Sequence, residues 1–204
     1  FQRRISTPDF NAGFQRRIST PDFNAGFQRR ILMPDLDAGF QYLKTNLEVG
    51  IYKESYNFYG ANISFGWRIN ANNKIQIDIA GLGAHKDRSG LETTLVVIPE
   101  LFTYSYCIPL GSKGQWELRL SPSIGLSYIH GRRDWWSLFG NLKEDDNDIS
   151  FAYGAGAGIT WHASKRVYLD LSYRYLRVSG PNLWDVNFED MDTSAFTLAC
   201  GWKF

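Results

Sequence analysis

The sequence contains little cysteine and no long apolar run, and both absences narrow the classes of protein that fit. Two cysteines among 204 residues cannot make a disulfide framework, and no Cys-x-x-Cys motif or Cys/His cluster offers a structural zinc site. The longest uninterrupted apolar run is residues 95–98, whereas a membrane-spanning helix needs roughly 20 such residues. The formal net charge of +1 does not suit a nucleic-acid-binding protein, so no nucleic acid partner is expected.

The chain opens on a tandem repeat. The segment FQRRISTPDFNAG spans residues 1–13, recurs unchanged in residues 14–26, and becomes FQRRILMPDLDAG in residues 27–39. This period matches none of the usual solenoid repeats. Two interpretations are open: a polar periplasmic leader, or a segment that binds a periplasmic or membrane protein partner through equivalent sites. We therefore divide the chain into a repeat segment, residues 1–38, and a folded domain, residues 39–204.

Beyond residue 39 the apolar residues recur with a period of two. Successive side chains of a strand point to opposite faces, so this period predicts amphipathic strands. In residues 115–130 one face carries Trp116, Leu118, Leu120, Pro122, Ile124, Leu126 and Tyr128, and the other carries Glu117, Arg119, Ser121, Ser123, Gly125 and Ser127. The run exceeds the ~5–6 residues of a typical globular strand and suffices for the about 9–11 residues of a membrane-crossing strand.

Seven further segments repeat this alternation, which gives eight predicted strands. They lie near residues 40–53, 59–70, 74–84, 91–110, 149–162, 167–178 and 196–204. Short Asn-, Gly-, Ser- and Lys-containing turns at residues 70–73, 111–114 and 163–166 alternate with longer polar links at residues 85–90, 131–148 and 179–192. This pattern predicts an all-β fold, an eight-stranded antiparallel up-and-down transmembrane β-barrel, with the short turns and both termini in the periplasm.

Two features of the predicted strands test this interpretation. A soluble lipocalin-like barrel, the alternative, would need an apolar interior and a polar exterior, but here an interior of Trp, Leu and Phe would overfill the lumen. By parity Glu100 faces lipid, near the outer interface where a charge costs little, and Pro99 predicts a bulge or an end of regular pairing. The membrane barrel remains the favoured prediction.

Three stretches carry a resemblance to a known family. The segments GAGAGITW (residues 154–161), YLDLSYRYLRV (168–178) and the terminal TLACGWKF (197–204) resemble the small eight-stranded outer-membrane barrels of the OmpA/OmpX type. The resemblance implies a cell-envelope protein in the outer membrane of a Gram-negative-type bacterium, in contact with outer-membrane lipid and lipopolysaccharide. It also implies a C-terminal signal for the barrel-assembly machinery, carried by Phe196, Leu198, Trp202 and Phe204.

Eight charged residues are predicted to face the lumen: Glu48, Arg68, Asp78, Glu117, Arg119, Asp170, Arg174 and Lys203. An eight-stranded barrel has room only for its own side chains, and buried charges must pair. We therefore expect a barrel-interior charge network, with a narrow gated pore as the alternative.

The link at residues 131–148 is the main candidate for a surface interaction. Its residues Arg132, Arg133, Trp135, Trp136 and Phe139 predict either an aromatic belt with arginines near lipopolysaccharide phosphates or a docking surface, and an acidic run follows at residues 144–148.

Only one pair of residues in the sequence suggests catalysis. His162 and Ser164 resemble the spacing of lipid A deacylases, but the topology puts them at a periplasmic turn without a carboxylate to orient the histidine. No catalytic residue, metal or cofactor is expected, and Cys107 and Cys200 should be free thiols on opposite sides of the barrel. The leading prediction is a non-enzymatic membrane anchor, scaffold or surface-interaction barrel that is part of a larger envelope assembly. A lipid A-modifying enzyme is the alternative.

Overall fold

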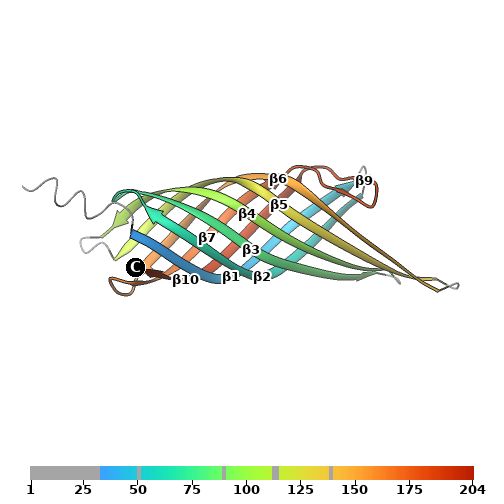
Figure 1. Ribbon diagram of the computed structural model, residues 1–204, viewed down its shortest axis with the longest axis horizontal. Helices are drawn as coiled ribbons and strands as arrows, with labels where there is room; N and C mark the ends of the chain where they lie inside the picture. The colour runs from blue at the N-terminus through green and yellow to red at the C-terminus, as the bar shows by residue number, and fades with distance from the viewer. Residues whose placement is uncertain (1–32, 50–51, 89–90, 112–114, 138–139) are drawn as a thin grey trace, which may run out of the picture.

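Eight long antiparallel strands close into a barrel in the computed structural model, which describes residues 33–49, 52–88, 91–111, 115–137 and 140–204 (Figure 1). The barrel strands are β1 (Met33–Val49), β2 (Tyr52–Arg68), β3 (Asn73–Arg88), β4 (Leu91–Leu110), β5 (Trp116–Ser137), β6 (Gly140–His162), β7 (Val167–Val178) and β10 (Met191–Lys203). Between β7 and β10, the short strands β8 (Asn182–Leu183) and β9 (Val186–Asn187) form a separate hairpin. Among the described residues no helix is long and apolar enough to cross a membrane. The predicted fold class is confirmed.

The barrel begins earlier than the sequence predicted. Strand β1 starts at Met33, six residues before the expected boundary at residue 39, and it pairs with β10 from Asp35↔Lys203 onward. Asp35 and Asp37 are buried in the lumen while Leu36 between them faces outward. The third repeat is therefore partly the first barrel strand, and the first two repeats lie outside the described residues.

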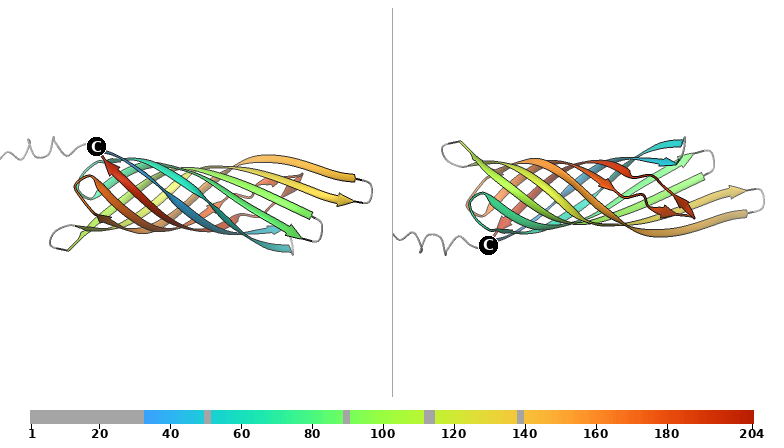
Figure 2. Two further views of the ribbon diagram at one scale, coloured as in Figure 1. Left: turned by 90° about the horizontal axis from the view of Figure 1, so that it is seen from below. Right: turned by 90° about the horizontal axis from the view of Figure 1, so that it is seen from above.

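The two ends of the barrel differ (Figures 1 and 2). The C-terminus and the tight turns before β3, β5 and β7 share one end, called here the turn end. At the opposite loop end, β5 and β6 extend farthest, because they contain 22 and 23 residues while β7 contains only 12. The predicted interruption at Pro99 is present: β3–β4 pairing stops at Ile79↔Glu100 and resumes at Leu82↔Val97.

A band of apolar side chains surrounds the barrel toward its turn end. Outward-facing residues such as Leu120, Ile124 and Leu171 are about half exposed, although they are large and apolar. The band's turn-end edge carries exposed Trp116, Trp161 and Trp202, and its loop-end edge carries exposed Tyr59, Tyr153 and Tyr175. Apolar bands between aromatic girdles are typical of membrane barrels, whose hydrocarbon solvent favours them.

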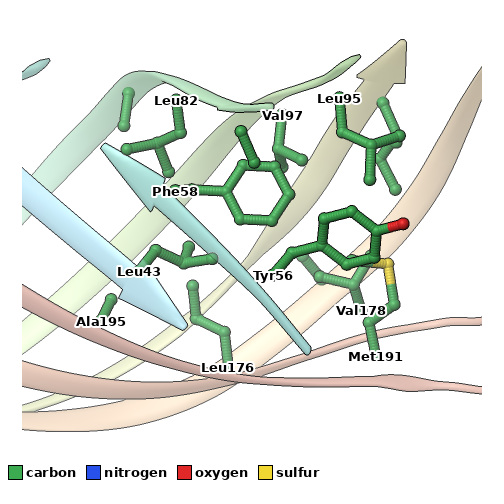
Figure 3. Packing of buried hydrophobic residues seen from close by; sticks show 14 of the residues in the cluster. Leu43, Tyr56, Phe58, Leu82, Leu95, Val97, Leu176, Val178, Met191 and Ala195 are labelled. Atoms are coloured by element: carbon green, nitrogen blue, oxygen red, sulfur yellow. The ribbon is translucent and has the colours of Figure 1, made fainter. Parts of the chain in front are cut away.

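Beyond the tyrosines the polarity of both faces reverses, although on β5 and β6 the outward apolar residues continue as far as Tyr128 and Ile149. Outward positions there hold exposed polar residues such as Lys44, Asn57 and Asn147. Inward positions hold a packed apolar core, in which Phe58 is 0% and Leu82 is 1% exposed (Figure 3). Hydrocarbon surrounds the part of the barrel nearer the turn end, and water surrounds the part nearer the loop end, called here the upper barrel. The upper barrel therefore has the polarity of a soluble protein, with apolar residues inside and polar residues outside.

Candidate functional site

Charged side chains pair across the lumen in the half of the barrel nearest the turn end. The ion pairs are Arg174–Asp78 (2.7 Å between Nη2 and Oδ2), Arg68–Glu117 (2.9 Å between Nη2 and Oε1) and Arg119–Asp170. Neighbouring polar side chains complete the pairing of both carboxylates. Thr160 donates over 2.7 Å to Oδ1 of Asp170, the oxygen that Arg119 leaves, whereas Thr103 donates over 2.7 Å to the same Oδ2 of Asp78 that Arg174 contacts, and Gln76 donates to its Oδ1. Six of the eight charged residues assigned to the lumen are thus brought together in three pairs.

The other two predicted lumen charges lie apart from these pairs. Lys203 is half-buried at the turn end, where its Nζ is 3.3 Å from Nδ1 of His162. The Nε2 atom of His162 is in turn 3.8 Å from Glu117. Glu48 lies opposite Lys53 in the β1–β2 ladder, at the loop end. Its side chain lies outside the described residues, so its assignment to the lumen stays a prediction.

Sequence reasoning missed a second set of lumen charges. Lys74 is buried, with its Nζ 3.1 Å from Asp35 and 3.6 Å from Asp37, and Tyr168 donates a hydrogen bond of 2.9 Å to Asp37. The two aspartates escaped because they lie in the third repeat. The signal was nevertheless present: Asp35, Leu36 and Asp37 alternate polar and apolar as the rest of the strand does.

A small polar cavity remains inside the charge network. Its volume is about 30 Å³, and Asn62, Asp78, Arg119 and Arg174 contribute to its lining. Oδ1 of Asn62 and Nε of Arg119 are both buried without a hydrogen-bond partner in the protein. A cavity of this size holds one or two water molecules, which can satisfy such groups.

Apolar side chains pack across the lumen above the charges. Leu43, Phe58, Leu82, Leu176 and Ala195 come from five different strands and meet in this core (Figure 3). At its loop-end side, burial and the neighbouring Glu54 raise the pKa of Tyr56, whose hydroxyl donates to Glu54 over 2.9 Å. The core separates the charge network from the loop end.

The β8–β9 hairpin covers the core at the loop end. Its two central residues, Trp184 and Asp185, have φ values of 54° and 58°, a conformation that usually requires Asn or Gly. Leu183 is 1% exposed in the core. The Trp184 ring lies against Gly131, where a Cβ atom would come within 2.5 Å of it, and Arg133 stacks over that ring at 3.6 Å. Tertiary contacts therefore hold this turn in place.

Two acidic residues of β6 fasten the same hairpin. The backbone N–H of Trp184 donates to Asp146, and that of Asn182 donates to Asp148 over 2.9 Å. The acidic run is thus partly structural. Burial lowers the pKa of Arg133, the arginine that covers Trp184.

The residues predicted for surface interaction therefore have different surroundings. Arg133 packs on the β8–β9 hairpin, while Arg132 lies 3.3 Å from Asp134 and 3.9 Å from Asp145. Trp135 is 44% exposed and stands in register with Leu91 of β4 and Leu142 of β6. The side chains of Trp136 and Phe139 lie outside the described residues.

The upper part of β6 forms a free sheet edge. Its pairing with β7 starts only at Ala152↔Val178, whereas its pairing with β5 continues to Ser137↔Gly140. In the described part of the chain, no strand pairs with the other side of residues 140–151. The carbonyl of Phe151 points to that side, since it accepts the N–H of Ser179. By strand alternation the backbone groups of Lys143 and Asp145 also point there.

Three of the predicted assembly-signal residues share one face of β10, and the fourth, Phe204, directly follows that strand. Phe196, Leu198, Trp202 and Phe204 are all exposed on the barrel wall. Their position fits a recognition signal, although recognition itself stays a prediction.

The two residues considered for catalysis, His162 and Ser164, have different partners and do not form a catalytic pair. Ser164 accepts hydrogen bonds from the backbone N–H groups of Arg166 and Val167, so its hydroxyl shapes a turn, while His162 contacts Lys203 and Glu117. The described residues contain no group of three metal-ligating side chains. Cys107 is buried, Cys200 is exposed, and both are free thiols as predicted.

Comparison with known proteins identifies the fold. Residues 32–204 match the family model described as the outer membrane protein beta-barrel domain. This span starts one residue before β1. No curated protein matches the chain.

Solved structures of similar shape are small outer-membrane barrels. Neisserial surface protein A is 19% identical, with a TM-score of 0.61, over 84% of this chain and 97% of its own. Ail, the attachment invasion locus protein of Yersinia pestis, is 15% identical, with a TM-score of 0.58, over 85% of this chain and 99% of its own. A second Ail structure, in complex with the heparin analogue sucrose octasulfate, is 19% identical with a TM-score of 0.56 over the same shares. At these identities the likeness concerns the fold.

Proposed function

Since the chain belongs to the outer membrane protein beta-barrel family, and is therefore a protein of the Gram-negative outer membrane, we propose that it is a non-enzymatic barrel that binds an extracellular polypeptide at its loop end. In this proposal the loop end faces outward and both termini lie in the periplasm. The free edge of β6 carries the proposal, because unpaired N–H and C=O groups can pair with an added strand.

The charges on this edge define the partner. Residues 143–148 contain one lysine, one glutamate and three aspartates, and none of them is buried. An added strand rich in lysine or arginine would complement this charge. Apolar side chains of β6 itself, Leu142 at 62% and Ile149 at 64% exposed, offer contact area beside the backbone pairing. The partner that fits best is an extended, basic polypeptide.

The competing functions have less support. A gated pore would need the apolar core of Phe58, Leu82 and Leu176 to unpack, together with the β8–β9 hairpin that covers it. A lipid A-modifying enzyme would need a nucleophile and a base in contact, but Ser164 and His162 have separate partners at the turn end.

One substitution pair tests the edge. Asp145→Pro removes the N–H that points to the free side, whereas Asp145→Ala removes the same carboxylate and keeps the N–H. The full chain, in phospholipid vesicles, is titrated with a peptide of alternating lysine and valine, and with a glutamate–valine peptide. We expect the lysine peptide to bind wild type and Asp145→Ala, with Asp145→Pro at least severalfold weaker. Equal binding by the two variants, or preference for the acidic peptide, would refute strand addition at β6.

Orientation is tested separately on intact cells. A protease site inserted between residues 138 and 139 should be cleaved from outside, whereas one placed in the turn at residues 163–166 should stay protected. The reverse pattern would refute the proposed orientation.

A further inference from the structure

The GAGAG segment of β6 leaves a bare strip on the lipid-facing wall. Gly154, Gly156 and Gly158 point inward, so the outer face at this level carries only Ala155 and Ala157. The residues in register on the neighbouring strands are much larger. Ala157 stands between Leu120 of β5 and Tyr173 of β7, and Ala155 stands between Pro122 and Tyr175.

An apolar groove follows from this difference in side-chain size. Its volume is about 310 Å³, and its outward-facing lining is Leu118, Ala157, Ile159, Leu171, Tyr173 and Phe196. The Tyr173 hydroxyl is engaged with Ser194 at 3.1 Å, and its ring packs at 4.9 Å, centroid to centroid, on Phe196. The groove is ten times the roughly 30 Å³ share of one water molecule in the liquid, and it lies in the hydrocarbon band. Its chemistry suits an acyl chain.

Two cationic side chains, Lys44 and Arg177, lie on the outer wall between the groove and the loop end. Arg177 is in register with Tyr153, and its Nε and Nη2 atoms are 2.9 and 3.3 Å from the two carboxylate oxygens of Asp192. Tyr153 and Tyr175 of the belt are further partners of its guanidinium group. Lys44 is exposed and forms no ion pair within the described residues. It is in register with Ser194, which is itself in register with Tyr175, so Lys44 and Tyr175 are about 10 Å apart.

We propose that the wall formed by β6, β7 and β10 binds one lipid A molecule. An acyl chain occupies the alanine-floored groove, and a phosphate lies near Lys44 and Arg177, flanked by the tyrosines of the belt. Charge complementarity selects an anionic lipid with its head group at the loop-end edge of the band. This assignment rests on the orientation proposed above, in which the loop end meets the lipopolysaccharide leaflet.

The test uses the full chain in phospholipid nanodiscs that contain purified lipid A in both leaflets, so the result does not depend on orientation. Native mass spectrometry measures how much lipid A stays bound after release from the disc. Ala157→Leu fills the groove. Gly81→Leu is the matched control, because it adds the same side chain at a lipid-facing site where nothing lies within 4 Å of an added Cβ atom. Lys44→Gln tests the phosphate contact, with Lys165→Gln in the opposite turn as its control.

We expect wild type to retain one lipid A molecule. Ala157→Leu should retain about tenfold less, as expected when about two methylene groups are excluded from the groove, and Gly81→Leu should match wild type. Lys44→Gln should lower retention severalfold, while Lys165→Gln should not. Equal retention by Ala157→Leu and Gly81→Leu overturns the groove assignment. Equal retention of phosphatidylglycerol by wild type overturns the choice of lipid A. Heat-dependent gel migration verifies that each variant is folded.

Discussion

The reversal of polarity along the barrel can be tested with arginine substitutions on the outer wall. Leu120 is 47% exposed within the apolar band, whereas Asn147 is exposed beyond the tyrosine belt on the neighbouring strand. An arginine on the lipid face costs about 2–4 kcal/mol near the midplane and about 0–1 kcal/mol at the interface. We therefore expect Leu120→Arg to lower the free energy of unfolding by about 2–4 kcal/mol, and Asn147→Arg to change it by less than about 1 kcal/mol.

The inner wall should give the complementary result. Leu82 is 1% exposed in the apolar core. Leu82→Ala should lower the free energy of unfolding by about 2–5 kcal/mol, because it leaves a cavity. Ser121 faces the polar half of the lumen, where its hydroxyl lies 2.8 Å from that of Ser105. Ser121→Ala should cost only about 1 kcal/mol, the net value of one hydrogen bond.

Reversible denaturant unfolding of the four variants in phospholipid vesicles measures these free energies. The reasoning predicts a large loss for Leu120→Arg and Leu82→Ala and a small one for Asn147→Arg and Ser121→Ala. If Asn147→Arg were as damaging as Leu120→Arg, the apolar band would extend to the end of β6. If Leu82→Ala were harmless, the upper lumen would not be a packed core.

Three further outcomes follow from individual contacts. Asp170→Leu should cost about 3–5 kcal/mol in the same unfolding assay because it leaves Arg119 unpaired, and adding Arg119→Met should recover most of that loss; no recovery would mean that the charge pair is not the cause. Gly201→Ala should impair refolding into vesicles, since its Cβ would lie 2.0 Å from the Tyr168 ring, while Gly81→Ala should refold normally; equal yields would contradict the close packing. In the folded barrel, a membrane-soluble maleimide should label exposed Cys200 and spare buried Cys107; labelling of Cys107 in single-cysteine variants would show that its side chain is accessible.

Period-two alternation was enough to predict the barrel and the faces of its membrane-embedded segments. It assigned Arg68, Asp78, Glu117, Arg119, Asp170 and Arg174 to strand faces that the structure places inward. What alternation could not give is pairing. That Arg119 meets Asp170 across the lumen depends on barrel closure, which no local pattern encodes.

Alternation also fails where the solvent changes. The sequence reasoning placed apolar residues outward along the whole of each strand, which is valid only where hydrocarbon surrounds the barrel. In β1 the inward residues include Leu43 as well as Gln41 and Thr45, because Leu43 already belongs to the apolar core. The prediction that Glu48 faces the lumen came from this stretch of β1. It assumed that apolar residues point outward, an assumption that holds only where the strand is surrounded by hydrocarbon.

The tyrosine belt marks that limit in the sequence itself. Below the belt, an interior of charges and hydroxyls is stable because the apolar face is solvated by lipid. Above it, the same strands meet water, so the apolar face must turn inward, and a core such as that around Phe58 becomes necessary. A core open at the top would expose apolar surface, which explains why Leu183 and a strained Trp184 are packed over it. The hairpin that covers the core donates two backbone N–H hydrogen bonds to Asp146 and Asp148, on the strand that has the free edge. The inward side chains of the acidic run, Asp146 and Asp148, therefore hold the hairpin that closes the barrel. The backbone groups at the free edge of the same strand are the ones that the proposed partner would pair with.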